Sequence, residues 1–272
     1  MSEPTGYVLG QARDAGRRLE IQDQQFAGPS ERLLDELVLK PGDRVVELGC
    51  GPGGMTRRIL RRLGTAGVVV GVDGSQGLLD QARAALAGLG RFETVVANVS
   101  ELGSWLDGAD VVIGRNILHH VPMAELLVGR LRTAIKPGTR VGFIEPDFRI
   151  PVARLGYLEA TGRSELAPLR VWATVINQLY QARDISPAVG ATLGPAMEAA
   201  GYRNVRTFWS EYPTDAAVVE NLVMFYDEVR DTLGNLKIQT SSQVDEQQRL
   251  LRDLSEFPLP AAWGAHVIAA EA

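Results

Sequence analysis

The chain has 272 residues, a formal net charge of −5 at neutral pH and 45% hydrophobic residues. This composition is typical of a soluble globular protein, and the acidic balance argues against a nucleic-acid partner, because phosphate contacts need a basic surface. The single cysteine, Cys50, excludes a disulfide framework. No apolar run approaches the roughly 18 residues of a membrane span, so we expect no membrane partner and a cytoplasmic location.

The N-terminal part, residues 1–40, is predicted to form a polar helical arm. Its charged residues and glutamines surround the apolar positions Leu19, Ile21 and Phe26, which recur at helical spacing. A turn ends this arm, and the main domain is expected to occupy residues 41–272.

Beyond the arm, short apolar runs alternate with helix-length stretches. Strands followed by helices predict βαβ units, and continuous apolar strands predict a parallel sheet buried on both faces. Right-handed crossovers then make the sheet doubly wound. The predicted strands are 45–48, 68–72, 94–97, 111–113 and 141–144, and the helices between them are 55–63, 78–89 and 123–135.

Two helical insertions interrupt this alternation. The first, at about 147–190, carries aromatic residues at helical spacing and is predicted to form a lid. The second fills about 214–256. Between and after them, a helix at 193–200, a strand at 205–212 and a final strand at 263–270 complete a predicted α/β domain.

The glycine-rich segment 47–54 directly follows the first predicted strand and precedes a helix. Glycines let the backbone turn sharply and approach a ligand closely, and a helix N-terminus offers free N–H groups. Gly49, Gly51 and Gly54 fit the G-x-G-x-x-G dinucleotide pattern, and Asp73 ends the second predicted strand, where such proteins place the acid that binds ribose. The loop alone therefore leaves NAD and other adenosine cofactors open.

The order of motifs resembles the class I S-adenosylmethionine-dependent methyltransferases. Segment 47–53 matches the first motif of that family, and Gly71 to Ser75 looks like its second-strand segment, whose acid holds both ribose hydroxyls. Segment 96–99 takes the third-strand position, where Asn98 replaces the usual Asp beside the adenine amine; its side-chain oxygen can still accept a hydrogen bond. Arg115 to Pro122 resembles the loop after the fourth strand, and 132–138 the turn before the fifth.

This resemblance covers roughly residues 40–146. It implies a Rossmann-like, doubly wound, mostly parallel seven-stranded sheet with helical lid insertions, and S-adenosylmethionine as the cofactor. The cofactor-binding residues that it implies are Glu47, Gly49, Cys50, Gly51, Gly53, Asp73, Gly74, Ser75, Asn98, Val99 and Arg115.

The enclosed lid predicts a small-molecule substrate, of secondary-metabolite type, with an oxygen, nitrogen or carbon acceptor. Tyr7 lies in a segment resembling one that precedes the core in many bacterial small-molecule members. Asp147 follows the fifth strand and either orients substrate or caps the next helix. Aromatic side chains either line the substrate pocket or pack in the core; the substrate candidates are Phe148, Trp172 and Tyr180, with Tyr157, Trp209 and Tyr212 as further aromatic positions.

His119 and His120 follow the fourth strand, beside the expected methyl group. A histidine titrates near neutral pH and can accept a proton from the substrate. Because adjacent side chains do not easily face one cavity, we expect at most one to be catalytic; the alternative is that the pair packs at the start of the next helix. No His, Asp or Glu cluster has the spacing of a metal site.

Three other functions remain open: an NAD-linked oxidoreductase, a non-catalytic protein that keeps the cofactor fold, and a macromolecular methyltransferase. The acidic charge disfavours the last of these. Self-association through the arm and the helical insertions is also left open.

Overall fold

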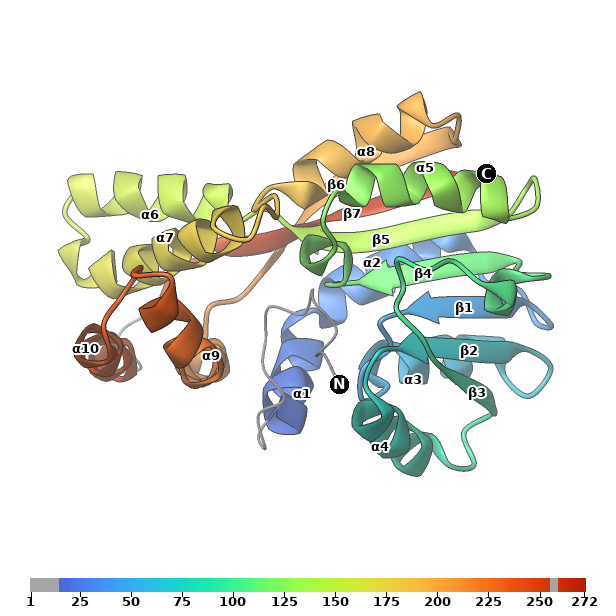
Figure 1. The fold of residues 1–272 in the computed structure, drawn as a ribbon, viewed down its shortest axis with the longest axis horizontal. Coiled ribbons are helices and arrows are strands. Elements are labelled where there is room, and N and C mark those ends of the chain that lie inside the picture. Colours follow the sequence, from blue (N-terminus) through green and yellow to red (C-terminus); the bar gives the residue numbers. More distant parts are fainter. Residues whose placement is uncertain (1–14, 255–258) are drawn as a thin grey trace.

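The structure, a computed structural model, describes residues 15–254 and 259–272; the substrate candidate Tyr7 lies outside them. The described residues contain a seven-stranded sheet in the order β3-β2-β1-β4-β5-β7-β6 (Figure 1). Its strands run parallel, except that β7 is antiparallel to both β5 and β6. The strands are β1 Arg44–Leu48, β2 Val68–Asp73, β3 Arg91–Val96, β4 Val111–Arg115, β5 Arg140–Pro146, β6 Arg203–Tyr212 and β7 Trp263–Glu271.

Helices cover both faces of the sheet, as the alternation of strands and helices predicts. Neighbouring strand residues such as Val45 and Val46 are both fully buried, each in a different apolar cluster, because side chains alternate between the faces. One cluster includes α2 (Ala27–Leu37), α3 (Gly54–Leu63) and α4 (Gln76–Leu86); the other includes α5 (Ala124–Ala134) and α8 (Val189–Ala199). The Rossmann-like doubly wound fold is confirmed.

Strand β3 departs from its predicted bounds. It begins at Arg91, three residues before the apolar run at 94–97. It pairs with β2 alone, at one edge of the sheet, and its residues alternate between exposed and half-buried. A half-exposed edge strand does not need a continuous apolar run, so the pattern predicted only its C-terminal half.

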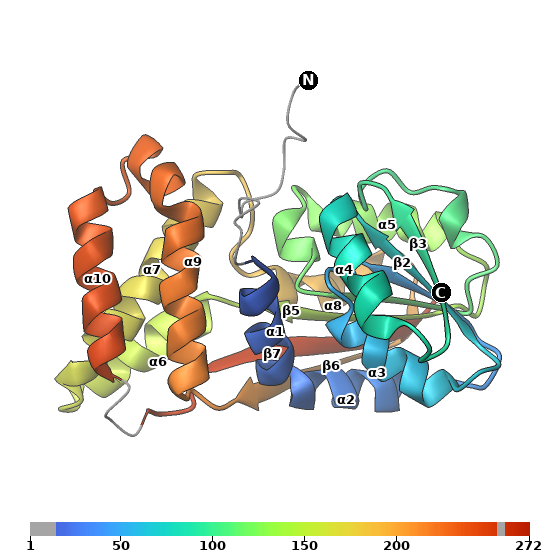
Figure 2. The same ribbon diagram turned by 90° about the horizontal axis from the view of Figure 1, so that it is seen from below.

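A separate helical layer lies beyond one end of the sheet (Figure 2). Its helices have their own apolar core, in which Trp172, Tyr180, Tyr226 and Trp263 are buried. None of the helices among the described residues is long and apolar enough to cross a membrane. The helices of this layer are α6 Arg149–Ala160, α7 Ala167–Gln181, α9 Ala216–Asn235 and α10 Ser241–Asp253.

Helix α1 (Ala15–Gln25) lies between the sheet domain and this helical layer (Figure 2). On one side, Arg18 forms an ion pair with Glu228 of α9, with a distance of 2.6 Å between Nε and Oε1. The amide of Asn221 in α9 donates a 2.8 Å hydrogen bond to Gln25. Helix α1 therefore contacts α9, which lies about two hundred residues further along the chain. These contacts hold α1 over the candidate site.

Candidate functional site

The glycine loop turns tightly at the C-terminal end of β1. Gly51 has a φ of 52°, in the left-handed region that glycine favours. A Cβ on Gly51 would meet only a Leu19 methyl group, at 4.0 Å, so the backbone here borders open space. Gly53 packs closely against the next helix, since a Cβ there would lie 2.7 Å from Leu86 of α4.

Asp73, at the end of β2, holds this loop in place. Its Oδ2 accepts a hydrogen bond from the Gly51 N–H and its Oδ1 accepts one from the Ser75 N–H, both at 2.9 Å. Burial raises the pKa of Asp73, although the N–H groups of Gly51, Gly74 and Ser75 oppose this effect. The carboxylate thus lies largely out of water without a cationic partner among the described residues.

The space beside this loop is a cavity, which we call the loop cavity. It brings together six of the residues predicted to bind the cofactor: Glu47, Gly49, Cys50, Gly51, Asp73 and Arg115. The other lining residues are Leu19, Gln22, Pro52, Gly54, Leu78, Asn116, Ile117 and His120. The remaining predicted positions, Gly53, Gly74, Ser75, Asn98 and Val99, are not among its lining residues, and their roles stay predictions.

Glu47 lies at the buried end of the loop cavity. Its Oε2 accepts a 2.6 Å hydrogen bond from the hydroxyl of Thr56 in α3. Burial raises its pKa to about 7, which the Thr56 bond and the positive charge of Arg115 only partly offset. This carboxyl therefore changes charge near neutral pH.

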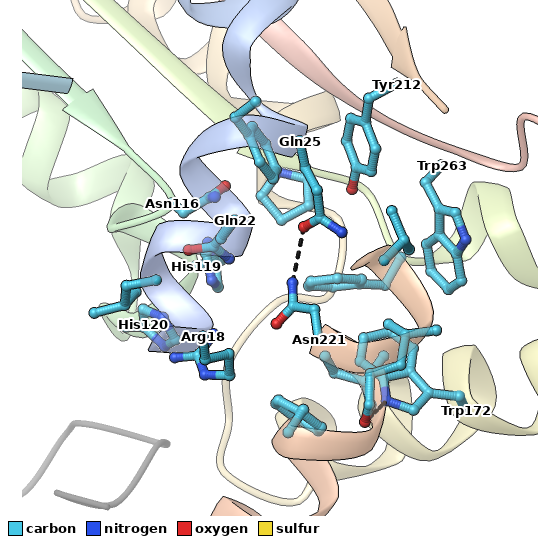
Figure 3. A pocket seen from close by; sticks show the side chains of 18 of the residues that line it. Arg18, Gln22, Gln25, Asn116, His119, His120, Trp172, Tyr212, Asn221 and Trp263 are labelled. Atoms are coloured by element: carbon cyan, nitrogen blue, oxygen red, sulfur yellow. Dashed lines mark hydrogen bonds between the residues drawn. The ribbon is translucent and has the colours of Figure 1, made fainter. Parts of the chain in front are cut away.

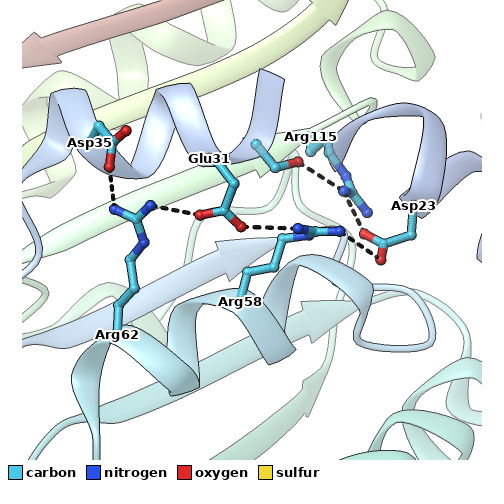
Figure 4. Close-up of polar contacts among 7 residues, drawn as sticks. Asp23, Glu31, Asp35, Arg58, Arg62 and Arg115 are labelled. Atoms are coloured by element: carbon cyan, nitrogen blue, oxygen red, sulfur yellow. Dashed lines mark hydrogen bonds and ion pairs between the residues drawn. The ribbon is translucent and has the colours of Figure 1, made fainter. Parts of the chain in front are cut away.

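Arg115, at the end of β4, connects the loop cavity to helix α1 (Figure 4). Its Nη1 lies 2.7 Å from Oδ1 of Asp23 in α1 and donates a 3.0 Å hydrogen bond to the Ser30 hydroxyl. Asp23 also pairs with Arg58 of α3, which in turn contacts Glu31 of α2 at 2.9 Å. This network holds α1 against the sheet domain at the edge of the cavity.

A second cavity, which we call the insertion cavity, adjoins the first (Figure 3). The two share Leu19, Gln22, Asn116 and His120 as lining residues, so they meet at this junction. The remaining lining residues of the insertion cavity are Arg18, Gln25, Phe26, His119, Pro146, Phe148, Trp172, Ile176, Tyr180, Tyr212, Val218, Asn221, Leu222, Phe225 and Trp263.

The predicted substrate residues divide between this cavity and other places. Phe148, Trp172, Tyr180 and the further aromatic Tyr212 line it. Asp147 is not a lining residue: its carboxylate pairs with Arg149 at 2.7 Å and also accepts the Arg149 N–H, at the start of α6. Asp147 thus contacts the first residue of α6, although the N-cap of that helix is Phe148, and its role toward a substrate stays a prediction.

Two other aromatic positions also lie outside the cavity. Tyr157 is 70% exposed, on the open side of α6. Trp209 lies on β6 and packs edge-on against His266, with ring centroids 5.2 Å apart. Helical or strand spacing does not tell which face of an element meets a cavity, and for these two residues the suggestion of a pocket role is wrong.

Both histidines line the insertion cavity, so the expectation that only one of them faces it is wrong. They lie in the 3₁₀ turn η2 (Leu118–His120), which places their ring centroids 4.0 Å apart. Burial, with the charges of His119 and Arg18, lowers the pKa of His120 well below its usual value. His120 is therefore neutral at physiological pH.

Glu145, near the end of β5, holds His119 in a fixed orientation. Its Oε2 lies 2.7 Å from His119 Nδ1, and its Oε1 accepts the N–H groups of Ile117 and Leu118 at 3.0 and 2.8 Å. Because the carboxylate accepts these bonds, Nδ1 carries a proton, and in the neutral form of the ring Nε2 carries the lone pair. Within the described part of the chain, Nε2 has no hydrogen-bond partner.

Asn116 lies at the junction, and sequence reasoning did not single it out. Its φ of 53° is one that asparagine tolerates better than most residues. Neither atom of its side-chain amide has a hydrogen-bond partner among the described residues, although both are buried. An amide in this state can donate to and accept from a ligand.

Sequence reasoning also missed the contribution of α1 and α9. Arg18, Gln22 and Gln25 line the insertion cavity from α1, and Asn221 and Phe225 line it from α9. The amphipathic pattern of these helices predicts burial but not a ligand. Among residues 15–254 and 259–272, no group of three or more His, Cys, Asp or Glu side chains is placed to hold a metal ion.

Comparison with known proteins identifies the relatives of this chain. A family model described as a methyltransferase domain matches residues 45–138. The trans-aconitate 2-methyltransferase of Variovorax paradoxus (strain S110) is 36% identical over 124 residues, which cover 44% of this chain and 45% of that protein. The enzyme of that name from Rhizobium leguminosarum bv. trifolii (strain WSM2304) is 28% identical over 211 residues, covering 76% and 77%.

A cyclopropane-fatty-acyl-phospholipid synthase-like protein from Lactobacillus casei ATCC 334 has a similar structure. Its TM-score is 0.64 at 18% sequence identity, covering 97% of this chain and 95% of that one. This likeness shows the fold, and the sequence matches add the family. Residues 45–138 match the methyltransferase domain family, and the relatives together with the fold support a class I S-adenosylmethionine-dependent methyltransferase.

Proposed function

We propose that this protein transfers a methyl group from S-adenosylmethionine in the loop cavity to a small molecule in the insertion cavity. The observation that carries the proposal is the junction, where Leu19, Gln22, Asn116 and His120 line both cavities. Methyl transfer needs its two reactants in contact and in line, away from water. Two adjoining cavities with a common wall meet this requirement.

The loop cavity suits the cofactor. Asp73 presents a buried carboxylate of raised pKa, which hydroxyl donors such as those of a ribose would stabilise. The absent side chain of Gly51 leaves room for a ligand against the backbone. When bound, S-adenosylmethionine supplies an electrophilic methyl group on a sulfonium. Glu47, Asp73 and Arg115 are the charged side chains proposed to hold it, and Gly74, Ser75, Asn98 and Val99 keep their proposed supporting roles.

His119 is proposed as the general base. Its Nδ1 bond to Glu145 leaves the Nε2 lone pair for the proton of a hydroxyl or an acidic carbon. The same bond fixes the plane of the ring, so the base does not need to be oriented during the reaction. His120, neutral and at the junction, would contribute an uncharged side chain where the two reactants meet.

The substrate is proposed to be a small, largely apolar metabolite with an oxygen or carbon acceptor. Aromatic side chains form much of the insertion cavity, which favours a ring system. No Asp or Glu is among the described lining residues, and a cationic amine would lack a carboxylate partner there. The relatives named trans-aconitate 2-methyltransferase also support a small organic molecule.

Two measurements test this function. Calorimetry with S-adenosylhomocysteine and with NAD should give binding for the first alone, and absence of S-adenosylhomocysteine binding would contradict the proposal. Transfer of a labelled methyl group from S-adenosylmethionine should then be followed over a panel of phenols, aromatic ketones and carboxylic acids. Cofactor binding without transfer to any of them would instead favour a non-catalytic homologue.

A further inference from the structure

The insertion cavity has two chemically different walls. Trp172, Leu222, Phe225 and Trp263 form an apolar wall from α7, α9 and β7. Helix α1 contributes polar side chains instead, with Arg18, Gln22 and Gln25 at successive positions of one face. Figure 3 shows these α1 side chains across the cavity from Trp172 and Trp263. A ligand that fills this space needs an apolar body and a polar end.

Arg18 dominates the polar wall. Among the described lining residues it is the one Arg or Lys, and no Asp or Glu accompanies it on the cavity surface. It is only 3% exposed. Burying a guanidinium is costly unless it is paired, so its partners decide what it can do.

The ion pair with Glu228 satisfies only part of this guanidinium. The contact runs through Nε, at 2.6 Å from Oε1 of Glu228, a residue that does not line the cavity. Arginine has five N–H donors in a planar fork. Within the described part of the chain, no acceptor is hydrogen-bonded to Nη1 or Nη2. Glu228 therefore fixes the guanidinium from behind and leaves its terminal donors for another acceptor.

Resting on the methyltransferase function proposed above, we propose that Arg18 binds a carboxylate of the substrate, whose remaining part is a flat apolar ring system against the aromatic wall. A planar fork that is already oriented suits a carboxylate better than a neutral oxygen. The ion-paired carboxylate is the anchor and not the methyl acceptor, because Arg18 lines only the insertion cavity and lies away from the junction with the loop cavity. It fixes the orientation of the molecule relative to His119 and the junction.

Calorimetry on the full chain, saturated with S-adenosylhomocysteine, tests this assignment. The probes are benzoate, 2-naphthoate and anthracene-2-carboxylate, each compared with its neutral carboxamide, and trans-aconitate as an acid without a ring. At least one ring acid should bind wild type with an affinity at least about tenfold higher than that of its carboxamide, as expected for hydrogen bonds to a charged group. The same acid should exceed trans-aconitate in affinity by about the same factor. Arg18→Gln should abolish this preference.

Two further variants separate recognition from folding. Arg18→Gln leaves Glu228 without its partner, so the double variant Arg18→Gln with Glu228→Gln keeps a neutral pair at the same place and should also lose the preference. Arg17→Gln changes the exposed neighbouring arginine, which does not line the cavity, and should keep it.

The outcomes separate this inference from the proposed function. If wild type binds S-adenosylhomocysteine but none of the ring acids, or binds acid and carboxamide equally, Arg18 is not a carboxylate site while the methyltransferase function stands. A preference that persists in the folded double variant also overturns the assignment. Absence of S-adenosylhomocysteine binding overturns the proposed function itself.

Discussion

His119 Nδ1 lies 2.7 Å from Oε2 of Glu145, on a carboxylate that also accepts backbone N–H groups from the same turn. A residue of β5 thereby fixes both the backbone and the ring of a residue that follows β4. A histidine oriented in this way by an acid is a common form of general base.

Replacement of His119 by alanine should lower turnover about 100-fold or more, since a general base contributes at least that factor. The affinity for S-adenosylhomocysteine should not change, because His119 lines only the insertion cavity. Turnover is measured with an acceptor found in the panel and affinity by calorimetry. Full activity in His119→Ala would leave this residue a packing role only.

Glu145→Gln tests the orientation of the ring. The amide of glutamine can donate to Nδ1, which moves the ring proton to Nε2 and removes the base. Turnover should fall as it does in His119→Ala, and the dependence of turnover on pH should change with it. If Glu145→Gln keeps the wild-type pH profile, Glu145 does not act through His119.

Asp73→Asn should weaken the binding of S-adenosylhomocysteine about tenfold or more, because hydrogen bonds to a charged group contribute about 1.5–3 kcal/mol. Asp80→Asn is the matched control, since Asp80 is exposed on α4 and contacts Arg83. Calorimetry on both variants gives the comparison. Equal affinities in wild type and Asp73→Asn would remove Asp73 from the cofactor site.

Glu47 should make the stability of the ligand-free protein depend on pH. Its pKa is about 7 in the folded state and 4.5 ordinarily, so between these values the folded protein retains a proton that the unfolded chain releases. The free energy of unfolding therefore falls as pH rises through this window, by on the order of 3 kcal/mol, and the loss is complete above the folded pKa.

Glu47→Gln should remove this loss. Urea unfolding at about pH 5 and about pH 8 should show a smaller decrease in stability for Glu47→Gln than for wild type. Glu101→Gln, a change at an exposed position, should behave as wild type. The same decrease in all three proteins would show that another group carries the pH dependence.

Gly190 and Gly129 should respond oppositely to alanine. A Cβ on Gly190 of α8 would clash with the backbone oxygen of Glu145, so Gly190→Ala should destabilise the protein by about 1–3 kcal/mol. Nothing lies within 4 Å of a Cβ on Gly129 of α5, and Gly129→Ala should stabilise the protein by up to about 1 kcal/mol. Thermal unfolding of both variants measures the difference, and a loss of stability in Gly129→Ala would refute the second expectation.

The sequence predicted the sheet well because its central strands are buried on both faces and therefore read as continuous apolar runs. It also predicted the loop cavity in part, since Gly51 lies in the loop after β1 and Asp73 ends β2, and parallel strands bring such positions to one edge. It could not choose between His119 and His120, because the choice depends on Glu145, which lies 26 residues from His119 in the chain.

The walls of the insertion cavity were harder to foresee for the same reason. Arg18 has no motif around it, and its partner Glu228 is 210 residues away. Periodicity assigns residues to a helix face but does not say which distant helix meets that face. The same limit explains two errors about exposed positions. The pattern missed the first half of the edge strand β3, and it could not show that Tyr157 faces away from the cavity.

The position of β7 has a consequence for how the molecule assembles. This strand follows the other six described strands in sequence, yet it lies between β5 and β6 in the sheet. During synthesis β6 therefore emerges before its partner strand, and the gap between β5 and β6 is filled only when residues 263–271 have left the ribosome. Pairing over such long stretches of chain is slow and exposes unpaired strand edges meanwhile. A nascent chain that stalls before Trp263 lacks both the strand that joins β5 to β6 and the Trp263 side chain that lines the insertion cavity.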